Sequence, residues 1–207
     1  MTRIKCCGMT RVADALLAAQ LGADAIGLVF TARSPRKVTI ALAQEIAHAL
    51  PPFVATVALF MDDDERWVQQ VVEEVQPALL QFHGAESDAW CTGFGRPFLK
   101  AIAMGEGLAV LADLHAYPHA AALLLDAHAR GAAGGTGQTF DWSLLPAGML
   151  QPLVLAGGLD AQNVGAGIRA LRPWAVDVSS GVESAPGIKA ADKLAAFIQA
   201  VHAADAA

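Results

Sequence analysis

The chain has 207 residues and a formal net charge of −6, with 55% hydrophobic and 16% charged residues. This composition permits a large buried core and excludes a disordered chain. No apolar run approaches the ~20 residues of a membrane-spanning helix, and basic tracts are missing, so neither a membrane nor a nucleic acid is an expected partner.

The cysteines and the N-terminal segment limit the class of protein further. The chain has three cysteines, Cys6, Cys7 and Cys91. Because this number is odd and the neighbours Cys6 and Cys7 are poorly placed to bond each other, no disulfide framework is predicted. Without a CxxC or HExxH motif, no metal site is predicted either. The start, Met1 to Lys5, lacks the apolar centre of a signal peptide, and we expect a soluble, cytoplasmic protein.

Apolar β-rich segments alternate with Ala- and Leu-rich helical segments along the chain. Most strand candidates are nearly continuous apolar runs, as expected for parallel strands covered on both faces. The predicted strands are Arg3–Cys7, Ala25–Phe30, Val54–Phe60, Leu79–Phe82, Phe98–Ala101, Ala122–Asp126, Leu153–Ala156 and Ala175–Ser179. The predicted helices are Val12–Leu21, Ile40–Leu50, Asp64–Val75, Ser87–Trp90, Leu108–His115, Ser143–Leu145, Ala161–Leu171 and Ile188–Ala203.

Eight strand–helix units without a break in composition predict an α/β protein, a closed (β/α)₈ TIM barrel in one domain over residues 1–207. The alternative is a doubly wound open sheet, which would carry a GxGxxG fingerprint after its first strand. Cys7-Gly8-Met9-Thr10 does not match that fingerprint, so the barrel is favoured. In a barrel, the residues that follow each strand meet on one face.

The ends of the predicted strands carry a set of reactive groups that folding stability alone does not explain. They are Cys7, Arg36, His83, Lys100, Asp126 and Asp177. An Asp buried where a strand ends favours its protonated form and suits proton donation. Cys7 as a base would need a lowered thiol pKa, which Lys5 or Arg36 could provide. The structural alternatives are inert packing for Cys7 and a turn cap for Asp126.

Glycine-rich loops follow the last three predicted strands. Gly157-Gly158 and Ser180-Gly181 would let backbone N–H groups approach an anion, at the loops where barrels of this fold often bind phosphate. The segment Gly134-Gly135-Thr136-Gly137 could add donors or act as a flap. Each loop alone is better explained as an ordinary turn, but the three together favour a phosphate site.

Three of the polar residues at the predicted strand ends are candidates for substrate binding. Arg36 follows Pro35, which stiffens its segment, and a guanidinium matches carboxylates and phosphates, although a solvated charge is the alternative. His83 can hydrogen-bond a substrate or serve the adjacent glycine turn. Asp177 can orient loop backbone or a substrate hydroxyl. The tryptophans at positions 67, 90, 142 and 174 are predicted to be packing residues.

Several of these segments, in this order, resemble the phosphoribosylanthranilate isomerase family of tryptophan biosynthesis. The matching motifs cover nearly the whole chain, so the resemblance is specific. They are Lys5-Cys6-Cys7-Gly8-Met9-Thr10, Gly27-Leu28-Val29-Phe30 with Ser34-Pro35-Arg36, Gln81-Phe82-His83-Gly84, Asp126 with Gly134–Gly137 and Phe140-Asp141-Trp142, Leu155–Leu159 with Asn163-Val164, and Asp177–Glu183 with Pro186-Gly187 and Lys189.

The resemblance implies a barrel that performs an Amadori rearrangement, without cofactor or metal. N-(5-phosphoribosyl)anthranilate would become 1-(2-carboxyphenylamino)-1-deoxyribulose 5-phosphate. It implies Cys7 as general base, Asp126 as general acid and Arg36 on the anthranilate carboxylate, with the loops Gly157-Gly158 and Ser180-Gly181 on the phosphate. The family includes monomers and homodimers, and both stay open.

One departure from the family and two alternatives remain. Cys6 stands where the family usually has an aliphatic residue. Strand alternation places Cys6 and Cys7 on opposite faces, and the resemblance implies that Cys7 points into the site and Cys6 packs behind it. The related histidine-pathway (ProFAR) isomerase performs the same rearrangement, but it resembles two half-barrels with an Asp at the first strand. A non-catalytic barrel that binds phosphoryl ligands would leave the Cys7–Asp126 pair unexplained.

Overall fold

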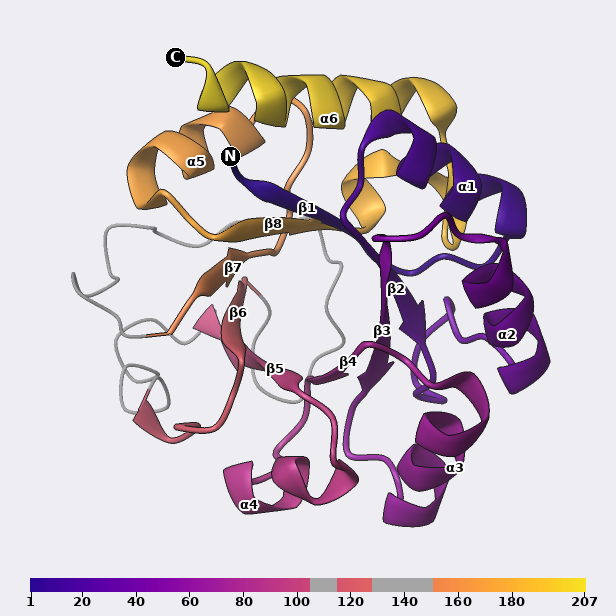
Figure 1. Ribbon diagram of the computed structural model, residues 1–207. Coiled ribbons are helices and arrows are strands. Elements are labelled where there is room, and N and C mark those ends of the chain that lie inside the picture. Colours follow the sequence, from indigo (N-terminus) through magenta and orange to yellow (C-terminus); the bar gives the residue numbers. More distant parts are fainter. Residues whose placement is uncertain (105–114, 128–150) are drawn as a thin grey trace.

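A closed parallel barrel forms the centre of the molecule. The computed structural model describes residues 1–104, 115–127 and 151–207. Strands β1 to β8 follow one another in sequence order, and β8 pairs with β1 to close the ring (Figure 1). The strands are β1 (Arg3–Cys6), β2 (Ala25–Val29), β3 (Ala55–Phe60), β4 (Leu79–Phe82), β5 (Phe98–Ala103), β6 (Ala122–Asp126), β7 (Leu153–Leu155) and β8 (Ala175–Val178). The predicted barrel is confirmed.

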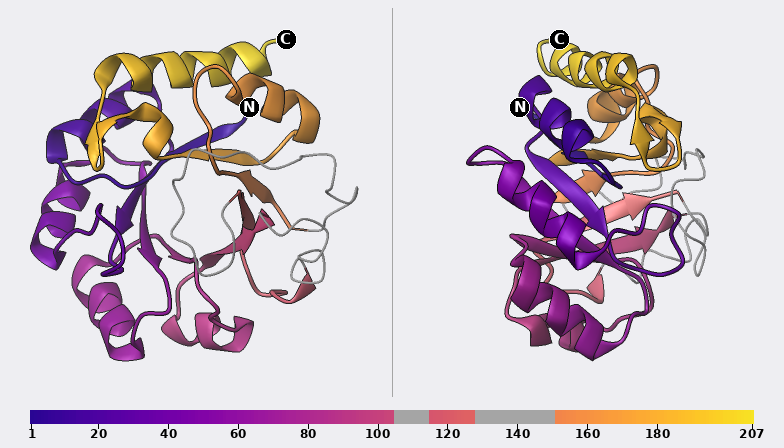
Figure 2. Two further views of the ribbon diagram at one scale, coloured as in Figure 1. Left: turned by 180° about the vertical axis from the view of Figure 1, so that it is seen from behind. Right: turned by 90° about the vertical axis from the view of Figure 1, so that its right-hand side faces the viewer.

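Helices surround the strands on the outside of the ring, seen from behind and from the side in Figure 2. They are α1 (Val12–Leu21), α2 (Ile40–Ala49), α3 (Glu65–Val75), α4 (Asp88–Cys91), α5 (Val164–Leu171) and α6 (Ala191–Asp205), with the 3₁₀ helices η1 (Thr92–Phe94) and η5 (Ser180–Val182). The side chains of Thr39, Asp64 and Ser87 cap α2, α3 and α4 by accepting from backbone N–H groups. Within the described ranges, no helix is long and apolar enough to cross a membrane.

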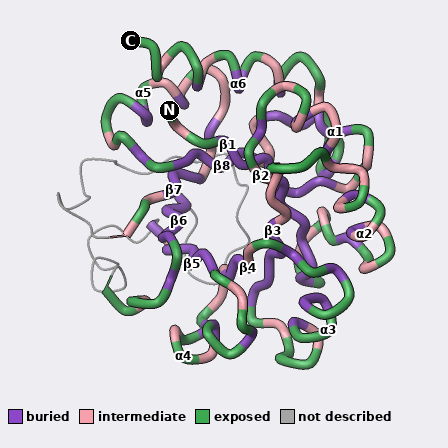
Figure 3. The backbone as a smooth tube through the Cα atoms, in the orientation of Figure 1, coloured by how far each residue is buried: buried purple, intermediate pink, exposed green. Residues whose placement is uncertain are grey.

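The strands of the ring are buried along most of their length (Figure 3). Side chains alternate between the two faces of the barrel wall, and the buried ones form an outer cluster and smaller inner clusters. Ile4 and Cys6 point outward, into the large core that the strands share with the helices. Cys7 lies in a small inner cluster with Val29 and Leu59. The two adjacent thiols therefore lie on opposite faces of the wall, as strand alternation predicts.

Two helix starts were predicted three residues too early. The helix expected at Ile188–Ala203 begins at Ala191, because Ile188–Lys189 (β10) pairs with Glu183–Ala185 (β9) in an antiparallel hairpin. The turn of this hairpin needs the positive φ of 80° at Gly187.

The helix expected at Ala161–Leu171 begins at Val164. Before it, the Asp160 carboxylate accepts hydrogen bonds from the N–H groups of Gln162 and Asn163, which favours a turn there. The helix expected at Ser143–Leu145, and all but the last residue of Leu108–His115, lie outside the described residues.

The tryptophans divide into two groups. Trp67 and Trp90 pack against the main core, as predicted. Trp174 is 51% exposed, and the guanidinium carbon of Arg3 lies 3.7 Å from its ring centre. Its exposed ring therefore makes a cation–π contact and does not fill the core. Trp142 lies outside the described residues.

A buried ion pair joins strand β5 to the loops after β3 and β4. The Lys100 ammonium donates to Glu86 at 2.8 Å and to the carbonyl of Gly84 at 2.5 Å. Glu86 in turn accepts from the backbone N–H of Asp62 at 2.8 Å. Lys100 was a candidate at the predicted strand ends, but these contacts give it a structural role.

We predict that Lys100→Met destabilises the protein strongly, because it leaves the buried Glu86 carboxylate without its counter-ion. Breaking a buried pair typically costs about 3–5 kcal/mol. The control is Arg33→Met, which removes an exposed pair with Asp62 at 3.4 Å and should cost less than about 1 kcal/mol. Urea unfolding of both variants measures the difference, and equal midpoints would contradict the assignment.

Candidate active site

One pocket at the carboxyl ends of the strands collects the predicted chemistry. Five of the predicted residues line it: Cys7, Arg36, His83, Asp126 and Asp177. Val29, Leu59 and Met61 form an apolar wall beside them. Among the described residues, no group of three or more His, Cys, Asp or Glu side chains could hold a metal ion. The pocket thus offers acid–base groups, a guanidinium and an apolar surface.

Backbone contacts on both sides fix the position of Cys7. Its N–H donates to the carbonyl of Val178 at 2.8 Å, and the N–H of Gly8 donates to the carbonyl of Gly27 at 3.0 Å. A Cβ atom on Gly27 would lie only 2.7 Å from the Cys7 sulfur. The thiol is therefore held against a position on β2 that has room for glycine alone.

Burial raises the pKa of the Cys7 thiol above its ordinary value, although the nearby Lys5 ammonium lowers it in part. This is opposite to the lowered pKa expected from the sequence. Lys5 donates to Asp177 at 2.9 Å inside the barrel, so its charge is shared between a carboxylate and the thiol. Burial raises the pKa of Asp177 as well, against the opposing effect of Lys5. The effect of burial is therefore larger than that of this one shared cation.

Asp126 is the last residue of β6, separated from β1 in the ring by β7 and β8. Its side chain is buried and lines the same pocket as Cys7. A Cβ atom on Gly157 would lie 3.0 Å from the Asp126 carboxylate, so the loop after β7 passes directly beside it. Asp126 is thus close to both the thiol-bearing pocket and one predicted phosphate loop.

Arg36 also reaches the pocket, but part of its guanidinium is already engaged. Nε and Nη2 donate to the two carboxylate oxygens of Glu183 at 2.8 and 2.7 Å. These hydrogen bonds raise the pKa of Arg36. One edge of the predicted carboxylate-binding group, formed by Nε and Nη2, therefore faces a residue of the protein, and the sequence did not indicate this partner.

His83 follows β4 and touches the side-chain amide of Gln81. Gln81 is fully buried and lines the pocket, and its Oε1 has no hydrogen-bond partner among the described residues. The sequence analysis did not select Gln81. The signal was available, because two positions along a strand share one face and His83 was already a candidate.

The two predicted phosphate loops lie side by side. The loop after β8 forms η5, and a Cβ atom on Gly181 would lie 1.9 Å from the carbonyl oxygen of Leu159 in the loop after β7. In the described part of the chain, the N–H groups of Gly157, Gly158 and Ser180 donate to no backbone carbonyl. The predicted phosphate-binding residues Gly157, Gly158, Ser180 and Gly181 do not line the pocket itself, but Ser179 does. The segment Gly134–Gly137 lies outside the described residues.

We predict that Cys7 reacts with iodoacetamide at a higher pH than an exposed thiol, whose pKa is about 8.5. Lys5→Met should move this reaction to still higher pH, because it removes the ammonium that lowers the pKa of Cys7. Both measurements use a Cys6→Ala background and mass spectrometry of the peptide that carries Cys7.

Cys91 is the internal reference, since burial raises its pKa to about 12. If the pH midpoint of the iodoacetamide reaction at Cys7 is the same in Lys5→Met as in the parent protein, or lower, Lys5 does not act on the thiol.

Known proteins are similar to this chain over nearly its full length. The family model described as N-(5'-phosphoribosyl)anthranilate (PRA) isomerase matches residues 4–200. An N-(5'-phosphoribosyl)anthranilate isomerase of Pseudomonas paraeruginosa is 54% identical over 200 residues, which cover 97% of this chain and 95% of the relative.

Solved structures agree. The crystal structure of phosphoribosyl anthranilate isomerase from Thermotoga maritima has a TM-score of 0.90 and 37% identity, and the match covers 98% of this chain and 100% of that one. A phosphoribosyl anthranilate isomerase in complex with reduced 1-(o-carboxyphenylamino)-1-deoxyribulose 5-phosphate has a TM-score of 0.83 and 35% identity, with coverage of 98% and 100%. The chain belongs to the N-(5'-phosphoribosyl)anthranilate isomerase family.

Proposed function

We propose that residues 1–207 form one catalytic domain that converts N-(5-phosphoribosyl)anthranilate into 1-(2-carboxyphenylamino)-1-deoxyribulose 5-phosphate. The observation that carries the proposal is that Cys7 and Asp126 line one pocket with Arg36. This reaction requires a base, an acid and an anion-binding group, and the thiol, the carboxyl group and the guanidinium can serve in these roles respectively. The ligand of the related crystal structure is a reduced form of the proposed product.

The first step opens the ribose ring, and we assign the proton to Asp126. Its carboxyl group protonates the ring oxygen as the bond from that oxygen to C1′ breaks. The lone pair of the anthranilate nitrogen forms a C=N bond to C1′, which gives an iminium ion. The place of Asp126 supports this role, since it is the last residue of β6 and lines the same pocket as Cys7.

The second step removes the C2′ proton, which the iminium ion makes acidic, and we assign it to the thiolate of Cys7. The electrons of the C–H bond form a C1′=C2′ bond, and those of the C=N bond return to nitrogen. The enolamine then gains a proton at C1′ and loses one from the 2′-hydroxyl, giving the ketone. Since burial raises the pKa of Cys7, its thiolate is scarcer but more basic, with Lys5 beside it as a cation.

The remaining residues of the pocket are proposed to hold the substrate. Arg36 would bind the anthranilate carboxylate of the substrate. His83 and Asp177 would face the hydroxyl groups of the substrate. For the phosphate, we propose the N–H groups of the paired loops Gly157-Gly158 and Ser180-Gly181. The loops after strands seven and eight commonly bind phosphate in barrels of this fold.

Cys7→Ala and Asp126→Asn should each lower kcat by roughly 10²–10⁴-fold while the circular dichroism spectrum is retained, because each removes one proton-transfer group. Cys6→Ala is the matched control, since Cys6 is buried in the outer core behind the barrel wall. Initial rates with N-(5-phosphoribosyl)anthranilate test the assignment. Loss of turnover in Cys6→Ala with near-native turnover in Cys7→Ala would reverse it.

The whole-protein test is growth of a tryptophan auxotroph that lacks this isomerisation. We expect the gene for this chain to restore growth, and a histidine auxotroph blocked at the equivalent rearrangement serves as the parallel test. Rescue of the histidine strain alone would favour the histidine-pathway isomerase. Growth of neither strain would favour a barrel that only binds phosphoryl ligands.

A further inference from the structure

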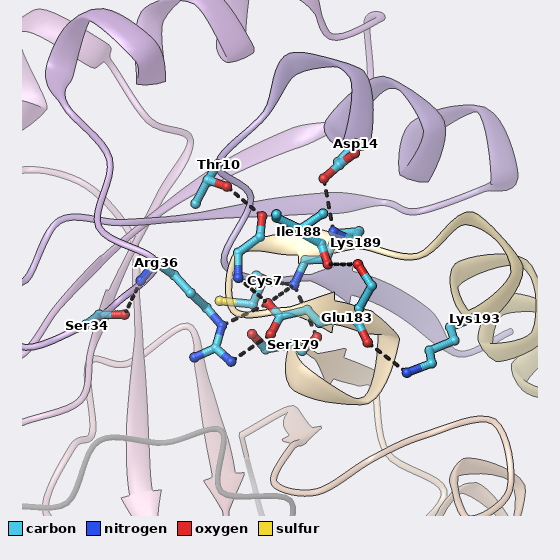
Figure 4. A network of polar contacts seen from close by, with 12 residues as sticks. Cys7, Thr10, Asp14, Ser34, Arg36, Ser179, Glu183, Ile188, Lys189 and Lys193 are labelled. Atoms are coloured by element: carbon cyan, nitrogen blue, oxygen red, sulfur yellow. Dashed lines mark hydrogen bonds and ion pairs between the residues drawn. The ribbon is translucent and has the colours of Figure 1, made fainter.

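Three charged side chains meet at the edge of the pocket: the partly buried Arg36 and the buried Glu183 and Lys189. The proposed mechanism uses only Arg36. Glu183 accepts from Arg36 at 2.7 and 2.8 Å and from the Lys189 ammonium at 2.8 Å (Figure 4). Glu183 and Lys189 both belong to the β9–β10 hairpin, which is separated from the last barrel strand, β8, by the short helix η5. Neither residue lines the pocket.

Lys189 connects this pair to the proposed base. Its side chain is fully buried, and its ammonium donates to three acceptors. Besides Glu183, these are the backbone carbonyl of Cys7 at 2.6 Å and that of Ser179 at 3.1 Å. One side chain thus ties the loop after β1 to the loop after β8.

The hairpin and the loop after β1 leave Arg36 little freedom. Gly8 has a φ of +74°, and a Cβ atom there would lie 2.5 Å from Cδ of Arg36, so the arginine stem crosses directly over Gly8. The backbone N–H of Gly187 donates to Glu183 at 3.2 Å, which fixes the carboxylate from the hairpin side. The guanidinium is held at both its stem and two of its nitrogen atoms.

Charge and geometry leave one edge of Arg36 for a ligand. The arginine, Glu183 and Lys189 together carry one net positive charge, because the lysine compensates the carboxylate that the arginine contacts. Hydrogen bonds from Arg36 and Lys189 hold the pKa of Glu183 below its ordinary value in spite of its burial, so Glu183 is charged at neutral pH. Within the described residues, Nη1 of Arg36 makes no hydrogen bond, and Arg36 lines the pocket.

We propose that Glu183 and Lys189 are positioning residues for the substrate carboxylate: Glu183 occupies Nε and Nη2 of Arg36 and aims the Nη1 edge into the pocket, while Lys189 compensates the charge of Glu183. This inference rests on the proposed function of the pocket. It makes the Nη1 side of the guanidinium, and not the Nε–Nη2 edge that Glu183 occupies, the group that recognises the carboxylate. Glu183 therefore strengthens the binding of an anion although it is itself an anion.

The test measures Kd by calorimetry for two ligands. One is reduced 1-(2-carboxyphenylamino)-1-deoxyribulose 5-phosphate, and the other is the same molecule with a phenyl group in place of the carboxyphenyl group. In Glu183→Gln, an amide group faces the donors of Arg36 and Lys189, so the arginine loses its fixed orientation. We expect Kd to rise about tenfold for the carboxylate ligand, the scale of one charge-assisted hydrogen bond, and less than about twofold for the other.

The controls separate positioning from charge and from folding. Lys193→Met removes a hydrogen bond of 2.8 Å to the backbone carbonyl of Glu183 and leaves the carboxylate contacts intact, so both Kd values should stay unchanged. Arg36→Lys keeps the charge without the Nη1 edge and should lose the preference for the carboxylate ligand. Adding Glu183→Gln to Arg36→Lys should cause no further loss, because Glu183 acts through Arg36. If Glu183→Gln does not fold, Arg36→Lys alone decides whether the Nη1 edge selects the carboxylate.

Three outcomes overturn the inference. Tighter binding of the carboxylate ligand by Glu183→Gln would mean that Glu183 merely neutralises Arg36. Equal losses for both ligands would mean that the hairpin is only a structural brace. An unmodified protein that turns over the substrate but binds both ligands equally would refute the inference and leave the isomerase function standing. Absence of turnover would instead refute the proposed function.

Discussion

The pairing of β8 with β1 closes the barrel, and the arrangement of the pocket depends on it. This register sets Lys5 beside Asp177 and Cys6 beside Val178. One residue further on, the Cys7 N–H donates to the carbonyl of Val178, so the thiol begins its loop at a fixed height above the ion pair. A shift of one residue in this pairing would exchange the inward and outward faces and place Cys6 in the pocket.

Burial has opposite consequences for the different charged groups of the barrel. Lys5 and Asp177, Lys100 and Glu86, and Arg36 with Glu183 and Lys189 each satisfy their charges by direct contact. Cys7 has no full counter-charge of its own, because Lys5 is shared with Asp177, and the pKa of the thiol rises. The protein thus keeps the proposed base protonated for most of the time.

The pocket residues that the sequence analysis found all stand at strand ends, where position along the chain predicts position in space. Cys7, Asp126 and Asp177 could be selected in this way because each stands at or near the end of a predicted strand. Glu183 and Lys189 could not, since they meet through an antiparallel hairpin that was predicted as loop and helix. Glu183 could not be recognised as the partner of Arg36 either, because the two residues are 147 positions apart in the sequence.

The amino-acid sequence by itself determined the eight alternating units, the barrel and the candidate acid and base, because periodicity and strand-end position are local properties. Its motifs also indicated the family that the comparisons then established. Only the tertiary structure decided the direction of the Cys7 pKa shift and the partners of Arg36. Both depend on which charges and which low-dielectric surroundings lie within a few ångströms, and contacts between distant segments set these. The pair Cys6–Cys7 needed both, since alternation separated the two thiols and barrel closure decided which of them faces the pocket.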